Sequence, residues 1–288
     1  MKAVTEEESN MHHFVNFRNS IIIIFISWII LAIVFGFYDL QISIVVVSWN
    51  ELPGSLGIFI KNFGEFGAEY GEGPGWGLIS VSIVILIGSF IKNRKLQNLP
   101  AWIIVGISLT LFIIGSIIPS YDLMWYGGFI GFSIILLELI TLKSDLRNFR
   151  NIALIILLLA ILNPLLFVNI TKPLCGRVRF RDLSDFSQYT PWFLPPGLDL
   201  NNLSFPSGHT AMGWILLPLM ILFRNRRTWI RSIGIFLIFG WGFFVGLSRI
   251  IVGAHYASDV LFSTEMAFLI TLLLFKKFSY NMLPDMKE

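Results

Sequence analysis

The chain has 288 residues, of which 55% are hydrophobic and only 14% are charged, and its mean hydropathy is +0.75. Soluble domains carry about 25% charged residues, so this composition excludes an ordinary soluble domain and indicates an integral membrane protein. The net charge is +3, and in a membrane protein an excess of Lys and Arg mostly reports orientation, so this charge does not indicate nucleic acid as a partner. The single Cys175 cannot form an internal disulfide.

Apolar segments near the roughly 20 residues that cross a bilayer recur along the chain. They predict a single all-α membrane domain, 1–288, built as a polytopic transmembrane helical bundle. Residues 1–19 are expected to form a cytoplasmic tail, and residues 38–75 include LQISIVVVSW, which is too short to span and is expected to lie in the membrane interface. About eight spans are predicted, at residues 20–37, 76–91, 101–118, 127–142, 152–170, 208–223, 229–247 and 258–275.

The distribution of Lys and Arg predicts the orientation of these spans. An even number of spans puts both termini on one face, and cytoplasmic loops carry an excess of Lys and Arg. The termini are therefore predicted to be cytoplasmic, in a multi-pass protein of the cell membrane. Of the 21 Lys and Arg residues, only six fall on the opposite face, and five of these cluster after the fifth span or at the end of the seventh: Lys61, Lys172, Arg177, Arg179, Arg181 and Arg249.

Three stretches on this outer face carry the candidate chemistry: TKPLCGRVRFRD (171–182), SFPSGHT (204–210) and LSRIIVGAHYASDV (247–260). Charged groups at the membrane boundary are costly and are functional candidates by default. Lys172 and Arg179 are seven residues apart, which on a helix places them on one face about two turns apart. With Arg249 they would suit a phosphate group. The alternative is a basic lip that touches lipid headgroups.

The second stretch predicts a helix N-terminus that faces an anion. Pro206 fits the first turn of a helix, where its missing N–H costs no hydrogen bond. The free N–H groups of Ser207, Gly208 and His209 would then point toward the anion.

Two histidines, His209 and His255, fall on the outer face beside the cations. Asp259 follows His255 by four residues, so both would lie on one face of the first turn of the eighth helix. A carboxylate bonded to one imidazole nitrogen fixes the tautomer and makes the other nitrogen a better nucleophile or base. His209 is then available to protonate a leaving oxygen. A purely structural His–Asp pair is the alternative.

Together the three stretches resemble the signature of the type 2 phosphatidic acid phosphatase superfamily. That signature is Lys, six residues, Arg-Pro; then Pro-Ser-Gly-His; then Ser-Arg, five residues, His, three residues, Asp. The match covers residues 172–259, with Ser248 beginning the third motif, and Phe180 stands where proline is usual.

The resemblance implies a role for each matching residue. His255 would attack phosphorus and form a phosphohistidine, Asp259 would orient it, and His209 would act as acid and then as base. No metal and no cofactor are implied. The residues implied to hold the phosphoryl oxygens are Lys172, Arg179, Ser207, Gly208 and Arg249.

The resemblance also bears on domain organisation. The family core has six helices, with three spans before the first motif, whereas five precede it here. We therefore interpret residues 101–142 as an inserted helical hairpin and residues 171–275 as the motif-bearing catalytic portion.

The predicted function is an integral membrane phosphatase acting at the extracytoplasmic face on a lipid phosphomonoester or an isoprenyl diphosphate. Its partners would be that lipid phosphate and the surrounding membrane lipids; neither the lipid's identity nor the oligomeric state follows from the sequence. One alternative is a phosphotransferase that uses the same phosphoenzyme, and another is a non-enzymatic anion-binding transporter or channel. Glu265, Trp192 and Phe193 are candidates for a substrate cavity, Glu265 alternatively pairing with a polar group in the core.

Overall fold

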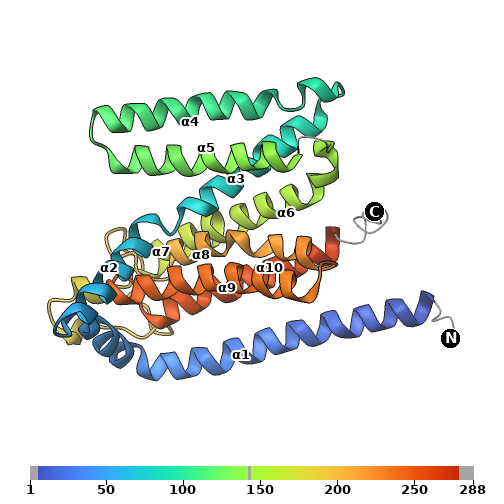
Figure 1. The fold of residues 1–288 in the computed structure, drawn as a ribbon. Helices are drawn as coiled ribbons and strands as arrows, with labels where there is room; N and C mark the ends of the chain where they lie inside the picture. The colour runs from blue at the N-terminus through green and yellow to red at the C-terminus, as the bar shows by residue number, and fades with distance from the viewer. Residues whose placement is uncertain (1–5, 142–143, 279–288) are drawn as a thin grey trace.

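A computed structural model describes residues 6–141 and 144–278, and these are mostly helical (Figure 1). A π-helical segment, Ile161–Val168, joins α6 to α7, and a 3-10 segment, Trp214–Phe223, continues α8. The α-helices are α1 (Glu6–Ser48), α2 (Ser55–Tyr70), α3 (Gly73–Phe90), α4 (Leu99–Ile117), α5 (Tyr121–Thr141), α6 (Arg150–Ala160), α7 (Asn169–Cys175), α8 (Gly208–Gly213), α9 (Thr228–Ile251) and α10 (Ala257–Phe278).

The helices confirm the predicted all-α polytopic bundle. A shorter apolar helix, Gly208–Phe223, corresponds to the sixth predicted span. Within the described residues, seven further stretches are long and apolar enough to cross a membrane, and they coincide with the other seven predicted spans: Phe17–Glu51, Ser55–Phe90, Arg94–Ile117, Tyr121–Thr141, Leu146–Asp182, Thr228–Ile251 and Ala257–Phe278.

The first helix is longer than predicted. α1 has 43 residues, which corresponds to about 65 Å at 1.5 Å per residue and is about twice the thickness of the hydrocarbon layer. LQISIVVVSW is not a separate piece, because α1 continues without a break to Ser48 and no Gly or Pro occurs in residues 37–52. Val46 in this part of α1 instead packs against Ile250, Ile251 and Ala257 of the bundle.

α4 and α5 form a hairpin that lies apart from the bundle of α6, α8, α9 and α10 (Figure 1). α5 packs along α3, which crosses from the hairpin to the bundle. The hairpin therefore contacts the bundle chiefly through α3. Within the hairpin, near its predicted cytoplasmic end, Asn98 Nδ2 donates to Glu138 Oε2 at 2.7 Å.

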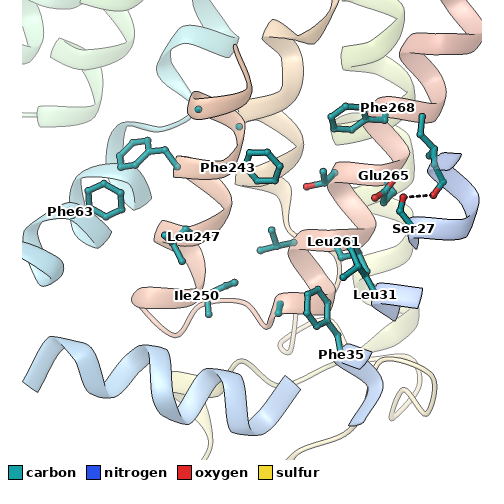
Figure 2. A pocket seen from close by; sticks show the side chains of 17 residues that line it. Ser27, Leu31, Phe35, Phe63, Phe243, Leu247, Ile250, Leu261, Glu265 and Phe268 are labelled. Carbon is teal, nitrogen blue, oxygen red and sulfur yellow. Dashed lines mark hydrogen bonds between the residues drawn. The ribbon is translucent and has the colours of Figure 1, made fainter. Parts of the chain in front are cut away.

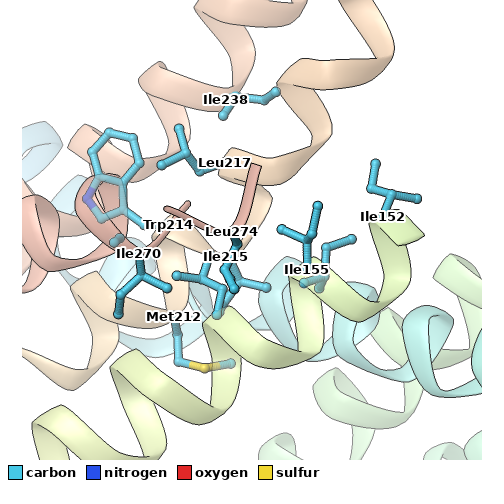
Figure 3. Packing of buried hydrophobic residues seen from close by; sticks show 12 residues of the cluster. Ile152, Ile155, Met212, Trp214, Ile215, Leu217, Ile238, Ile270 and Leu274 are labelled. Atoms are coloured by element: carbon cyan, nitrogen blue, oxygen red, sulfur yellow. The ribbon is translucent and has the colours of Figure 1, made fainter. Parts of the chain in front are cut away.

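The largest hydrophobic core surrounds Trp214, between α6, α9, α10 and the 3-10 segment that follows α8 (Figure 3). The Trp214 ring is fully buried, and its Nε1 donates to Thr264 Oγ1 at 2.8 Å. A Cβ at Gly242 would come within 2.6 Å of the Trp214 ring, so only glycine lets α9 approach this closely. This packing fixes α8, α9 and α10 relative to one another, and these helices carry two of the three motifs.

All three motifs lie at one end of the bundle. The amino ends of α8 and α10 and the carboxyl ends of α7 and α9 meet there, beside the long loop that follows α7 (Figure 1). α10 ends, and α1 begins, at the opposite end. The expectation that distant stretches of sequence meet at one membrane face is consistent with this arrangement.

Candidate active site

The first motif leaves its helix earlier than the spacing argument assumed. Gly176 adopts φ +56° at the end of α7, and a Cβ there would lie 2.2 Å from the Gly197 carbonyl oxygen, so the helix ends at a position that requires glycine. Arg179 then has an extended backbone, with φ −73° and ψ 150°. The prediction that Lys172 and Arg179 share a helical face is therefore wrong, and a folded loop brings Arg179 to the site.

Backbone hydrogen bonds join the three motifs to one another. Each bond links segments that are distant in sequence, so the arrangement of the site does not depend on side chains alone. The donors and acceptors are Ser204 N to Arg177 O at 3.0 Å, Ser207 N to Asp259 O at 3.0 Å, and Arg181 N to Gly253 O at 2.9 Å.

A buried chain of charges underlies the site and reaches α1. The Arg177 side chain is 1% exposed, and its NH1 lies 2.6 Å from Asp259 Oδ1, while its NH2 lies 3.0 Å from Asp39 Oδ2. Asp39 Oδ1 also accepts from the Ser258 N–H at 2.9 Å, at the start of α10, and the Ser258 hydroxyl contacts Oδ2. The Arg177 guanidinium lies over the Tyr256 ring at 4.0 Å. Two carboxylates thus neutralise and orient one buried cation.

His255 is held by a backbone carbonyl, which the sequence analysis did not identify. Its Nδ1 lies 2.6 Å from the Ser204 carbonyl oxygen, whereas Asp259 Oδ2 is 3.6 Å away, which is too long for a hydrogen bond. A carbonyl only accepts, so Nδ1 carries the proton and Nε2 keeps a free lone pair. The prediction that His255 hydrogen-bonds directly to Asp259 is therefore wrong. The Asp259 carboxylate instead accepts hydrogen bonds from Arg177, the Ser204 hydroxyl and the Tyr256 N–H.

His255 precedes α10 and is 2% exposed. Burial lowers the pKa of His255 to about 4, although the neighbouring carboxylate of Asp259 acts to raise it. The neutral imidazole is therefore the form present at pH 7, which is the form that has a nucleophilic nitrogen.

The Pro-Ser-Gly-His motif begins a helix, but with a different arrangement of donors. Ser207 is the N-cap of α8, so Pro206 precedes the helix instead of occupying its first turn. The prediction that the Ser207 N–H faces an anion is wrong, because this group donates to Asp259 O. The Ser207 hydroxyl oxygen accepts from Thr210 Oγ1 at 2.8 Å. The N–H groups of Gly208 and His209, in the first turn, have no acceptor within the helix.

Cations from two other segments converge on this helix start. A Cβ built on Gly208 would lie 3.5 Å from Lys172 Nζ, which places the ammonium beside the motif. Arg179 and Arg249 are also close enough to His209 for their charges to interact with it, and His255 lies nearby. The structure therefore brings together the residues predicted to bind phosphate and both histidines.

Arg179 and Arg249 each carry a buried Nε–H without a hydrogen-bond partner among the described residues. Arg249 is 8% exposed, and its NH1 donates to the Ala68 carbonyl at 3.2 Å, while Arg179 NH1 lies 3.9 Å from Asp182. Burying an unpaired donor on a charged group is costly, so these N–H groups favour an anionic acceptor at the site. Beside Arg249 a polar cavity of about 650 Å³ opens between α2 and the loop that holds Arg181.

The three predicted cavity residues lie elsewhere. Glu265 lines an apolar cavity of about 740 Å³ between α1, α9 and α10, together with residues such as Leu31 and Phe243 (Figure 2). Trp192 Nε1 donates to the Ala32 carbonyl of α1 at 2.9 Å, and Phe193 packs beside it. Trp192 and Phe193 therefore connect the long loop that follows α7 to α1.

Sequence reasoning missed several residues that contact the motifs, and some left a signal. Asp39 is a carboxylate at the end of a long apolar run, and Arg177 is one of the few outer cations. Glu72 lies between glycines, and its Oε1 is 3.1 Å from His209 Nδ1. Ser204 acts through its carbonyl oxygen, for which side-chain identity gives no signal. In the described part of the chain, no group of three or more His, Cys, Asp or Glu side chains is placed to hold a metal ion.

Comparison with known proteins bears on the same segments. The PAP2 superfamily model matches residues 153–283, which contain all three motifs. The resemblance to the phosphatidic acid phosphatase superfamily is confirmed. The chain is 44% identical over 78 residues to undecaprenyl-diphosphatase BcrC of Bacillus subtilis (strain 168), which covers 25% of this chain and 34% of that relative. The chain thus matches about a third of the relative's length, and no solved structure matches it.

Proposed function

We propose that the chain is an integral membrane phosphatase that hydrolyses an isoprenyl diphosphate or a lipid phosphomonoester through a phosphohistidine at His255. The observation that carries this proposal is the pair of unpartnered, buried Nε–H groups of Arg179 and Arg249 beside two histidines. A phosphoryl group would supply the missing acceptors. Most buried polar groups in proteins have a hydrogen-bond partner, so two unpaired cationic donors in one place support a site for an anion.

The proposed reaction has two steps. The His255 Nε2 lone pair attacks the terminal phosphorus and forms the N–P bond, while the bond from that phosphorus to the leaving oxygen breaks and this oxygen takes a proton from His209. The leaving group is the lipid alcohol of a phosphomonoester or the lipid monophosphate of a diphosphate. Water then attacks phosphorus, His209 takes the water proton, and the P–N bond breaks with its electron pair returning to Nε2. Throughout, the proton stays on His255 Nδ1, which donates a hydrogen bond to the Ser204 carbonyl. Lys172, Arg179 and Arg249, together with the Ser207 hydroxyl and the Gly208 amide, neutralise the phosphoryl oxygens, which is the main requirement of phosphoryl transfer.

The membrane setting and the comparisons support the proposed substrate class. A site at the end of apolar helices suits a substrate whose tail stays in the bilayer. The relative's name describes a diphosphatase of an undecaprenyl lipid, so an isoprenyl diphosphate is the first substrate to test. The family match equally supports phosphomonoesters of lipids.

A substrate panel tests the activity. Purified protein should release inorganic phosphate from undecaprenyl diphosphate, phosphatidate or phosphatidylglycerophosphate in the presence of a metal chelator. Transfer of the phosphoryl group to an added alcohol, without phosphate release, would indicate the phosphotransferase. Binding of phosphate without turnover of any substrate would indicate an anion-binding protein instead.

The roles of the histidines are tested by trapping the phosphoenzyme. Radiolabelled substrate quenched rapidly should leave acid-labile, base-stable label on the protein, and His255→Gln should abolish it. With an activated leaving group, His209→Gln should still form the label but hydrolyse it slowly, because the water lacks its base. If His255→Gln retains label and turnover while His209→Gln loses both, the roles are exchanged.

The proposed orientation places the site at the extracytoplasmic face of the cell membrane. It rests on the charge asymmetry of the loops and on the motifs lying at the end of the bundle opposite the end of α10. In a background without Cys175, a cysteine at position 188 should react with an impermeant reagent added outside, and one at position 225 should not. The reverse pattern would place the site in the cytoplasm.

A further inference from the structure

Glu72 contacts His209, although no motif includes it. Glu72 Oε1 lies 3.1 Å from His209 Nδ1, and the two side chains are 17% and 33% exposed. The other carboxylate oxygen, Oε2, accepts from Trp76 Nε1 at 3.4 Å. The carboxylate is therefore held from one side by an indole and faces the imidazole on the other.

The local sequence explains how a residue between α2 and α3 reaches α8. Trp241 Nε1 donates to the Gly71 carbonyl at 3.2 Å, which fixes the junction against α9. A Cβ at Gly75 would lie 2.7 Å from the Met212 carbonyl oxygen, so glycine lets the start of α3 pack directly on α8. The stretch GEGPGW is thus a close-packing junction that places Glu72 beside the histidine.

We propose that Glu72 is a positioning residue for His209, an inference that rests on the proposed phosphatase function. By accepting a hydrogen bond from Nδ1–H, the carboxylate would fix the tautomer of His209 and direct Nε2 toward the phosphoryl group. The same contact stabilises the imidazolium that exists before the leaving oxygen is protonated and after water is deprotonated. Each histidine would then have its own hydrogen-bond partner, the Ser204 carbonyl for His255 and Glu72 for His209.

The positive charges around His209 are a second observation that supports a role for Glu72. Lys172, Arg179 and Arg249 lie close enough to repel a positive charge on His209. Among the described residues, Glu72 is the carboxylate in contact with the imidazole. Its negative charge offsets part of that repulsion at a distance where the interaction is strong.

The test compares Glu72→Gln with the parent protein, using a substrate with an alkyl leaving group and one with a nitrophenol leaving group. Glu138→Gln is the matched control, because it also neutralises a glutamate that accepts a side-chain hydrogen bond, but on α5 outside the site. The kinetic measurements are kcat and KM for each substrate and the level of phosphoenzyme after rapid quench. Thermal unfolding of each variant in detergent measures whether the fold is retained.

For the alkyl substrate, kcat of Glu72→Gln should fall by about 10- to 100-fold, the usual effect of removing an orienting partner, with KM within about threefold. For the nitrophenol substrate, formation of the phosphoenzyme should fall much less, because this leaving group needs little protonation, and the label should persist. Glu138→Gln should match the parent in all of these measurements.

Four results would overturn the inference. Equal losses with both leaving groups would indicate a packing role, and a lower KM with unchanged kcat would indicate that Glu72 only repels the substrate. Parent-like kinetics in a folded Glu72→Gln variant would remove the positioning role and leave the proposed phosphatase intact. If the parent itself turns over no phosphate ester, the proposed function fails and this inference fails with it.

Discussion

Asp39→Asn tests whether α1 is coupled to the site through the buried charges. The change keeps the shape of the side chain but removes the negative charge that lies 3.0 Å from Arg177 NH2. Removing one partner of a buried ion pair costs about 3–5 kcal/mol. Because Arg177 NH1 keeps the Asp259 carboxylate at 2.6 Å, its charge is not left unpaired. We therefore expect the lower end of that range, about 3 kcal/mol.

Thermal unfolding in detergent measures this loss, with a thiol-reactive fluorophore that reports exposure of Cys175, the chain's single cysteine. A loss of about 3 kcal/mol corresponds to a Tm about 6–12 °C lower for a chain of this size. The control is Lys61→Ala, which breaks a solvent-exposed pair with Glu65 at 3.9 Å and should cost less than about 1 kcal/mol. If Asp39→Asn unfolds at the same temperature as this control, the buried charges do not couple α1 to the bundle.

The remaining predictions concern individual residues near the site and in the apolar cavity. Arg179→Ala should lower phosphate release by about 100-fold or more, because it removes a cation that faces developing charge. Phe180→Pro should stay within a few-fold, because Arg179 already has the extended backbone that a residue before proline adopts, and equal losses would contradict this reading. Burial lowers the pKa of His255 from 6.5 to about 4, so the acid limb of the kcat/KM profile should lie toward pH 4, and a limb near 6.5 would argue against the assignment. The unfolded chain binds this proton more readily, so melting curves should show stability falling as the pH decreases from 6.5 to 4. Glu265→Gln should leave hydrolysis of a water-soluble phosphomonoester unchanged while altering KM for a long isoprenyl substrate, because this side chain lines the apolar cavity (Figure 2).

The membrane spans were predictable because each depends on a local property, a run of apolar residues long enough to cross a bilayer. The same property could not show that a helix continues past the length needed to cross the bilayer. α1 extends to Ser48 because nothing in residues 37–52 interrupts it and because Val46 packs on α9 and α10. That packing is a tertiary contact, which a window of sequence does not contain.

The motifs predicted which residues would gather, but not the geometry of each contact. Lys172, Arg179, Arg249 and both histidines meet as expected. The backbone conformation at Gly176 changed how Arg179 arrives, since a helix was assumed where a left-handed residue ends it. The partner of His255 was missed because a backbone carbonyl holds the ring, and only the folded loop before α8 brings that carbonyl within reach.

The part of the chain that matches the family supplies the cations at the site. Two of the carboxylates that contact the site's residues come from the helices that precede this part. Residues 153–283 contribute Arg177 and the cations proposed to bind phosphate, but their own buried carboxylate at this place, Asp259, is already bonded to Arg177. α1 supplies Asp39 to the same guanidinium, and the α2–α3 junction supplies Glu72 to His209. Cations buried at low dielectric need such partners, so the amino-terminal helices complete the electrostatics of the site as well as the bundle. On this reasoning, the predicted catalytic portion 171–275 carries the groups proposed to react, and we expect their orientation to depend on two carboxylates that lie far earlier in the chain.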